Sequence, residues 1–424
     1  MSVKKVSVAS SFGSSGPSDN EPDALVQSRH NTNSAYGANA LASATESTTQ
    51  CTAMGTDALA RNTAPENTAV GARAGKNITT AVGTTAVGCD ALSQMSERVV
   101  ADDNTAVGHR AAMCTVSCSN TAMGADALLF NEQGRENTAV GASSGMVNVT
   151  GCCNTYLGFH AGYGVIEGSD NTVVGRAAQR AVASVSRVTV VGSGACADNT
   201  VSDTVGIGFH ALHSNQTGEC NVAVGPETLE QNVSGSNNTA VGAQALQHAW
   251  GSDNTIMGSK AMSRMGSTGS ENSGLGSQVL LVNTGSRNTA TGCRALVSNQ
   301  NGHHNTADGA LALSKCVAGN HNTSLGAQSC SAIVNGSSNV SLGSQSGPLN
   351  DVDDTISLGT GARATQTGEF ALGSAQHPLL TGKLVGDEGD ATECPVHPQL
   401  YLTVLLNGER YLLPLYKPSV ATSD

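Results

Sequence analysis

The chain repeats one short sequence pattern along most of its length. The stretch Gly235–Leu246 reads GSNNTAVGAQAL, and close variants of Asn-Thr-Ala-Val-Gly recur throughout the sequence. Anchoring each repeat on its glycine gives 21 glycines between Gly37 and Gly373, with 20 intervals over 336 residues and a mean spacing of 16.8. A period this constant predicts a repeat architecture in which each unit stacks on the next.

The length of the repeat decides which repeat architecture is possible. A unit of about 17 residues is too short for a pair of packed helices, but it fits one coil of a β-solenoid. We therefore expect an all-β fold, a parallel β-roll or β-solenoid of about 21 coils. Each coil would contain two strands of about five residues and two turns, and a coil spacing of about 4.8 Å gives a rod of about 100 Å.

The asparagine before the strand and the glycine after it are the predicted turn residues. Asparagine tolerates a left-handed backbone and bonds its own turn, so stacked asparagines would form an amide ladder up one edge. Glycine adopts positive φ and lets the next coil approach closely. The predicted ladder asparagines are Asn67, Asn104, Asn120, Asn137, Asn154, Asn171, Asn238, Asn254, Asn288, Asn305 and Asn322. The corresponding turn glycines are Gly71, Gly108, Gly141, Gly175, Gly242, Gly258, Gly309 and Gly326.

The strand pattern bears on assembly. In Thr-Ala-Val, threonine and valine point to one face of the strand and alanine to the other. Both rows stay small or apolar, which is typical of strands buried on both faces. One row can fill the coil, and the other needs a partner, so we expect further copies of the chain to cover it in a homotrimeric rod. The predicted core row consists of Val70, Val107, Val140, Val174, Val241 and Met257.

The two ends of the chain differ from the repeats. Residues 1–30 are serine-rich and read as a flexible arm or attachment segment, residues 31–376 as the β-roll, and residues 377–424 as a linker followed by a hairpin cap. In this last segment two apolar runs flank Asn407-Gly408, the dipeptide most typical of a hairpin turn.

Composition narrows the choice of partners. The chain of 424 residues has only 3% aromatic residues and a formal net charge of −12. That negative charge argues against sequence-independent binding to nucleic-acid phosphates and against binding to anionic membranes. The N-terminus lacks the apolar stretch of a signal peptide, and no segment has the length of a membrane span. We therefore expect folding in a cytoplasm, with the 12 cysteines as free thiols.

The repeats NNTAVGAQAL and DNTIMGSKAM resemble the YadA-like, left-handed β-roll heads of trimeric autotransporter adhesins. They are also similar to repeats in fibre proteins of tailed phages and large DNA viruses, and the ending EFALGSAQHPLLTG followed by YLTVLLNGERYLLPLY is similar to the ending of such viral proteins. This resemblance covers roughly residues 31–416. It implies a trimeric β-roll in which one end attaches to a larger particle.

The resemblance and its departures together give the functional hypothesis. The coiled-coil stalk and membrane anchor of a bacterial autotransporter are not recognisable here. We expect a non-enzymatic fibre, spike or capsid-associated protein on a virion surface, made in a host cytoplasm. Its expected partners are itself, other capsid proteins and a host receptor, without nucleic acid or membrane insertion. The alternatives are a glycan-degrading fibre enzyme, which predicts acids aligned on one face, and a cellular trimeric adhesin.

Several groups of residues partly resemble catalytic or metal-binding motifs. Cys114 and Cys118 do not have the Cys-x-x-Cys spacing of a zinc site. His303, His304 and His321 fall in neighbouring turns, where a surface metal site is conceivable, but exposed turn histidines are the simpler interpretation. Gly75-Lys76 lacks the rest of a P-loop, and Asp353-Asp354 replaces a turn asparagine. We therefore predict no catalytic residue, cofactor or metal ligand.

Overall fold

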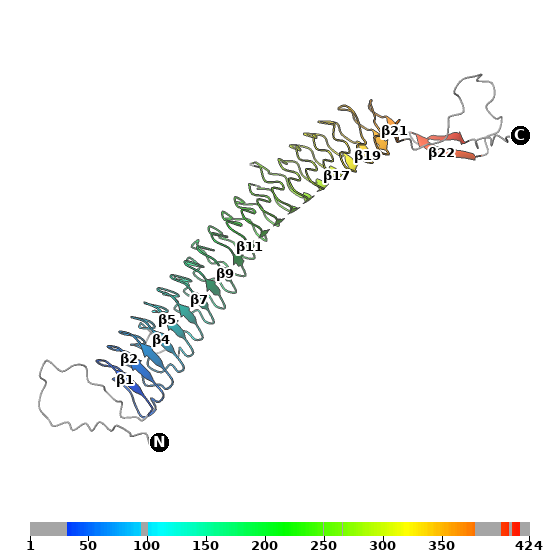
Figure 1. Cartoon of the computed structure of the whole chain (residues 1–424). Helices are drawn as coiled ribbons and strands as arrows, with labels where there is room; N and C mark the ends of the chain where they lie inside the picture. The colour runs from blue at the N-terminus through cyan, green and yellow to red at the C-terminus, as the bar shows by residue number, and fades with distance from the viewer. Residues whose placement is uncertain are drawn as a thin grey trace, which may run out of the picture.

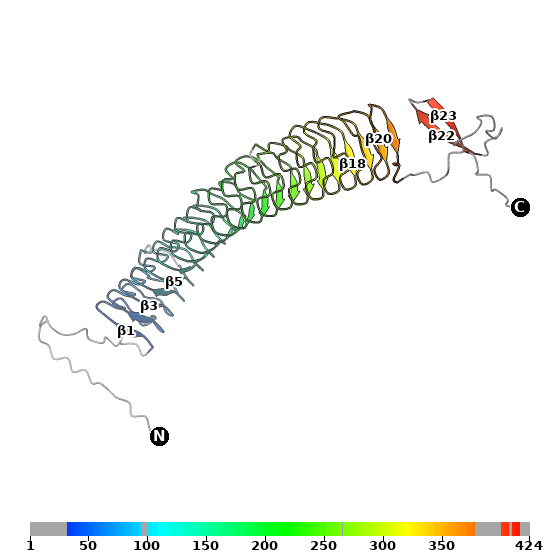
Figure 2. The ribbon, with the colours of Figure 1, turned by 45° about the horizontal axis from the view of Figure 1, so that its top comes forward.

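The computed structural model describes residues 32–94, 101–248, 250–264 and 266–377, together with the backbone of residues 400–406 and 409–415. The repeats wind into a β-solenoid that forms a long, curved rod, with one strand of each coil on the same side (Figure 1). Turning the molecule shows the same continuous stack of coils (Figure 2). The predicted all-β parallel solenoid with coils of about 17 residues is confirmed.

A single parallel sheet of 21 short strands runs along the rod. Every one of these strands ends immediately before one of the 21 repeat glycines. The strands are β1 Ser34–Tyr36, β2 Thr52–Met54, β3 Thr68–Val70, β4 Thr85–Val87, β5 Thr105–Val107, β6 Thr121–Met123, β7 Thr138–Val140, β8 Thr155–Leu157, β9 Thr172–Val174, β10 Thr189–Val191, β11 Val205–Ile207, β12 Val222–Val224, β13 Thr239–Val241, β14 Thr255–Met257, β15 Ser273–Leu275, β16 Thr289–Thr291, β17 Thr306–Asp308, β18 Thr323–Leu325, β19 Val340–Leu342, β20 Ile356–Leu358 and β21 Phe370–Leu372.

Neighbouring coils pair in register, so equivalent residues lie directly above one another. Strand β7 pairs with β8 through Thr138 with Thr155 and Val140 with Leu157, and the other neighbours repeat this alignment. Each coil therefore meets its backbone hydrogen-bonding needs through the coils before and after it, which leaves sheet edges only at the two ends of the stack.

In the coils that the structure describes, the second strand expected in each coil is not formed. The side of the coil opposite the sheet consists of tight turns in which the second and fourth residues after the repeat glycine have positive φ, as at Asp126 (60°) and Leu128 (48°). Such a backbone cannot continue as a strand. Hydrogen bonds still join the coils here, for example from Leu128 N to Ser144 O at 3.0 Å. The Ala-Leu pair predicted for that strand is buried inside these turns.

The interior is filled by the alanine row of the sheet and by the Ala-Leu pairs of the turns. Ala139, in the middle of β7, is completely buried, whereas Val140 beside it is partly exposed on the outer face. In many coils an alanine methyl group fills the space between the sheet and the leucine of the turn. The larger Val173, Val190 and Ile256 occupy the same inner position in coils without that leucine. The predicted core row was therefore wrong for the single chain, because all its members lie on the outer face: Val70, Val107, Val140, Val174, Val241 and Met257.

One large interior residue shows that side chains of neighbouring coils share a limited interior volume. Tyr156 replaces the strand alanine of β8 and is fully buried. Gly145 and Gly162 occupy the position that carries the buried leucine in many other coils, and a Cβ on either would approach the Tyr156 ring to 2.6 Å or 2.1 Å. The two missing leucine side chains thus provide the space that the ring fills.

The C-terminal segment contains the expected antiparallel pair. Strand β22, Leu400–Leu406, pairs with β23, Glu409–Leu415, so that Leu406 faces Glu409. The predicted turn residues Asn407 and Gly408 lie outside the described residues, as do the N-terminal segment 1–30 and the linker 378–399.

Candidate functional site

The predicted asparagines form a ladder inside the rod, interrupted by Thr84, Val188 and Thr204 at the equivalent positions. The backbone N–H of Asn171 donates to Oδ1 of Asn154 at 3.0 Å, and Nδ2 of Asn154 donates to the carbonyl of Gly168 at 2.8 Å. The same bonds recur at most of the predicted positions, for example from Asn322 N to Asn305 Oδ1 at 3.0 Å. Each amide therefore joins a strand to the turn of the following coil.

The ladder differs from the prediction in two respects. The asparagines are buried instead of lining an edge, and the left-handed residue is the one before them, such as Glu136 (φ 58°) before Asn137. Burial follows from the hydrogen bonds, because both ends of the amide are satisfied by backbone groups within the coil stack. The preceding residue takes the left-handed turn at the surface, where its side chain is free to vary.

A second buried asparagine column was missed from the sequence. Nδ2 of Asn148 donates to Oδ1 of Asn131 at 3.1 Å and to the carbonyl of Gly151 at 3.0 Å. The signal was present in the sequence, since each member of the column stands seven positions after a repeat glycine. These residues are Asn62, Asn131, Asn148, Asn199, Asn215, Asn232, Asn283 and Asn299.

The repeat glycines have the predicted role of close approach. Gly141 has φ of 132°, and a Cβ there would lie 2.5 Å from the carbonyl oxygen of Gly158 in the next coil. The other predicted turn glycines, from Gly71 to Gly326, share this geometry. Any side chain at these positions would push against the backbone of the adjacent coil.

The histidines of neighbouring turns make contacts between coils. Nδ1 of His303 accepts the backbone N–H of Ser286 at 2.9 Å, so the proton of the neutral ring lies on Nε2. The rings of His304 and His321 stack with centroids 4.9 Å apart. Among the described residues, no group of three or more His, Cys, Asp or Glu is arranged to hold a metal ion.

The eleven cysteines in the described part of the chain are not joined by disulfides. Cys196 is fully buried, and desolvation raises the pKa of its thiol to about 12. Cys153 is exposed, and desolvation together with the Glu136 carboxylate 3.5 Å away raises its pKa as well. Cys114 and Cys118 form no disulfide with each other.

Several acidic side chains pair with arginines of the adjacent coil. Arg110 Nε lies 2.8 Å from Asp126 Oδ1, and Arg187 Nε lies 2.6 Å from Asp203 Oδ1. The hydrogen bond from Arg187 lowers the pKa of Asp203. Each of these two carboxylates is engaged by an arginine, whereas a glycosidase places two carboxyl groups on either side of the scissile bond.

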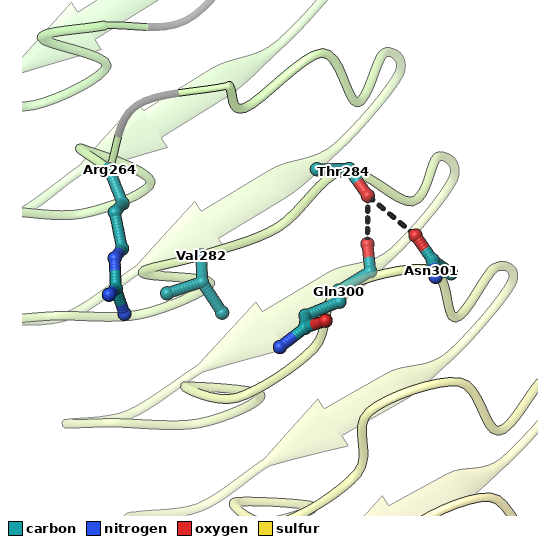
Figure 3. A pocket seen from close by; sticks show the side chains of 5 residues that line it. All are labelled: Arg264, Val282, Thr284, Gln300 and Asn301. Atoms are coloured by element: carbon teal, nitrogen blue, oxygen red, sulfur yellow. Dashed lines mark hydrogen bonds between the residues drawn. The ribbon is translucent and has the colours of Figure 1, made fainter.

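A small polar notch opens on the turn side of the rod and has a volume of about 280 Å³ (Figure 3). Its walls come from successive coils and consist of Arg264, Val282, Thr284, Gln300 and Asn301. The Thr284 hydroxyl donates to the Gln300 carbonyl and lies 3.0 Å from Asn301 Oδ1. The hydroxyl is thus engaged, and the notch contains no general base beside it.

The outer face of the sheet carries a row of exposed apolar side chains. We call the third residues of β1–β21 the outer row. They are apolar in 19 strands, with Thr291 and Asp308 as the exceptions. Leu157 is 45% exposed and Leu275 is 53% exposed. At the C-terminal end the first residue of the strand is apolar too, as in β21, where Phe370 is 54% exposed. An apolar strip of this length, interrupted at Thr291 and Asp308, is a candidate interaction surface.

Comparison with known proteins adds no relative. A scan against protein-family models gave no match, and searches of curated proteins and of solved structures gave none either. Within the described residues, no helix has the length and apolar character required to cross a membrane.

Proposed function

We propose that this chain is a non-enzymatic structural protein that assembles through its outer row into a homotrimeric rod and serves as a virion fibre, spike or capsid-associated protein with a role in host attachment. The observation that carries the proposal is the apolar outer row, which follows the sheet from Tyr36 to Leu372. The virion role depends on the sequence resemblance alone.

The arrangement of the outer row favours parallel copies of the same chain. Its side chains recur at every coil, so a second rod aligned at the same height places apolar groups opposite one another in every coil except those of Thr291 and Asp308. In a closed cyclic assembly around the long axis of the rod, every copy buries the same apolar surface. Burying a large apolar side chain contributes about 1.5–3 kcal/mol, and repetition over many coils offsets an association cost of about 4–15 kcal/mol.

The oligomeric state of the purified chain tests this proposal. Light scattering should give three times the 42.6 kDa of one chain, and small-angle scattering should give a rod. Leu157→Asp and Leu275→Asp should each yield a folded monomer, because both side chains are exposed in the single chain. Val140→Asp should also prevent assembly, whereas Lys76→Ala, which removes one surface ion pair with Asp57, should leave the trimer intact.

A monomeric wild-type chain would contradict the proposed assembly. A trimer that persists unchanged in Leu157→Asp, Leu275→Asp and Val140→Asp would place the interface elsewhere on the rod. Labelling of isolated virions with an antibody raised against the chain tests the proposed location separately from the assembly.

A further inference from the structure

Two exposed three-ring clusters stand on the same side of the rod. In each, a repeat glycine is followed by Phe-His-Ala, first at Gly158 and again at Gly208. Phe159 stacks on His160 with centroids 3.9 Å apart, and Phe209 stacks on His210 at the same distance. A third ring leans against each histidine, Tyr163 in the first cluster and His213 in the second.

Both phenylalanine rings are about half exposed and stack on a histidine. Phe159 is 49% exposed and Phe209 is 50% exposed, although the chain has only five phenylalanines in total. The stacked histidine holds each ring from one side, which leaves the other face available. Nothing in the folding of the coil requires phenylalanine here, because the same position carries alanine, serine or cysteine in other coils.

The two rings belong to one straight row of the solenoid. Phe159, Arg176, Ser193 and Phe209 each follow a repeat glycine directly in four successive coils; we call them the Phe-Arg-Ser-Phe row. Backbone hydrogen bonds keep them aligned, from Ala177 N to Phe159 O at 2.9 Å and from His210 N to Ser193 O at 3.2 Å. Three coil steps separate the phenylalanines, a distance of about 14 Å.

Between the rings lie the small side chain of Ser193 and the exposed positive charge of Arg176. Beside Ser193, Gly194 is buried beneath His210, because a Cβ there would lie 2.5 Å from the His210 ring. Arg176 is exposed and forms no ion pair or side-chain hydrogen bond with any described residue. The neighbouring Arg180, by contrast, lies 3.4 Å from Asp198.

We propose that the Phe-Arg-Ser-Phe row binds an extended oligosaccharide that carries a carboxylate, with pyranose rings stacked on Phe159 and Phe209 and the carboxylate paired with Arg176. The apolar face of a pyranose ring matches a flat, half-exposed aromatic side chain, whose other edges remain wet. The planar guanidinium matches a carboxylate in two-point contact. The proposal deepens the attachment role suggested above by naming the chemistry of the ligand.

Other ligand classes fit this row less well. A nucleic acid would also stack on the rings, but it carries a phosphate at every nucleotide, whereas the row supplies one cation, Arg176. A membrane needs a continuous apolar patch, whereas these rings are separated by Arg176 and Ser193. A peptide that extends the sheet needs a free strand edge, and the row lies in the middle of the stack.

Binding of two oligosaccharides of equal length to the full chain tests the proposal. Hyaluronan hexasaccharide contains glucuronate and no sulfate, and chitohexaose is its neutral counterpart. We expect saturable binding of the hyaluronan hexasaccharide in calorimetry, with Phe159→Ala and Phe209→Ala each raising Kd at least about tenfold. Arg176→Gln should raise the Kd for hyaluronan about tenfold and leave any chitohexaose binding unchanged.

A matched control separates this site from general exposed aromatics. Trp250 is 54% exposed, and its ring nitrogen donates to the Gln231 carbonyl at 3.0 Å, away from the Phe-Arg-Ser-Phe row. Trp250→Ala should therefore bind hyaluronan as the wild type does. Absence of saturable binding to either oligosaccharide overturns the proposal, as does equal binding by Phe159→Ala and Trp250→Ala. Because these side chains lie outside the outer row, this failure is distinguishable from failure of the trimer, which light scattering reads directly.

Discussion

Oδ1 of Asn137 accepts the backbone N–H of Asn154 at 3.0 Å, one coil further along the chain. In the same residue, Nδ2 donates to the carbonyl of Gly151 at 2.8 Å. One buried amide thus satisfies two backbone groups that belong to the next coil. Repetition of this arrangement supplies polar links between coils in a rod whose apolar interior consists mainly of small side chains.

Asn137→Ala should destabilise the rod strongly. The change leaves the N–H of Asn154 and the carbonyl of Gly151 buried without a partner, at a cost of about 1–3 kcal/mol for each group. Chemical denaturation followed by circular dichroism measures the loss. Asn301→Ala is the matched control, because Asn301 is exposed and accepts only from Thr284, so a change below about 0.5 kcal/mol is expected. Equal effects of the two variants would contradict the structural role of the ladder.

Gly141→Ala should separate two coils. The new Cβ would lie 2.5 Å from the Gly158 carbonyl oxygen, and φ of 132° is itself unfavourable for alanine. Gly368→Ala provides the comparison, because Gly368 also has positive φ but has no atom within 4 Å of the added Cβ. We expect the control to lose about 1–3 kcal/mol from backbone strain alone and Gly141→Ala to lose clearly more. Thermal unfolding of both variants measures this difference.

Tyr156 and Gly162 should be energetically coupled. Tyr156→Ala alone leaves a cavity and should cost about 3–5 kcal/mol, by analogy with other buried aromatic truncations. Gly162→Leu alone cannot fit, since even a Cβ would lie 2.1 Å from the tyrosine ring. The double variant restores the Ala and Leu of the common repeat and should be more stable than either single variant. Strict additivity in the double-mutant cycle would be incompatible with this packing.

Thiol labelling should follow burial and local charge. Iodoacetamide at pH 8 should leave Cys196, Cys316 and Cys330 unmodified in the folded chain, because they are buried and desolvation raises their pKa to about 12, about 11 and about 11. Exposed Cys153 should react faster in Glu136→Gln, since removal of the nearby carboxylate lowers the thiol pKa and increases the thiolate fraction. Mass spectrometry of peptides reads each site, and an unchanged rate at Cys153 would count against this electrostatic coupling.

Asp351 should make the C-terminal coils sensitive to acid. Burial acts to raise its pKa, but hydrogen bonds from the backbone N–H groups of Val334, Asn335 and Gly336 outweigh burial and lower it. Because the native pKa is depressed, the stabilisation is complete above the unfolded value of about 3.9 and disappears as pH falls through the lower native value. Wild type should therefore exceed Asp351→Asn in stability at neutral pH and lose that advantage in strong acid. A difference independent of pH would exclude a role for the charge.

The sequence by itself was sufficient for the stacking of coils. The repeat glycines mark where each of the 21 strands of the parallel sheet ends. The recurring asparagine identifies one of the two inner ladders. These features depend on local chemistry: only glycine allows the contact between Gly141 and Gly158, and an amide suits a position between two backbones. The second ladder could have been found by the same arithmetic.

Tertiary structure decided which side of the strand faces inward. Ala139 and Val140 are both apolar, so their alternation does not identify the interior row. The valine row was predicted as the core, but Ala139 is the residue that faces inward. Valine as such is not excluded from the interior, since Val173 and Val190 are buried there. The side chain of the facing turn decides which volume fits, and where that turn carries a leucine such as Leu128, alanine or glycine occupies the strand position. Tyr156 and the glycines that face it are explained in the same way. The side chains that share one interior space come from different coils, and their combined volume is conserved.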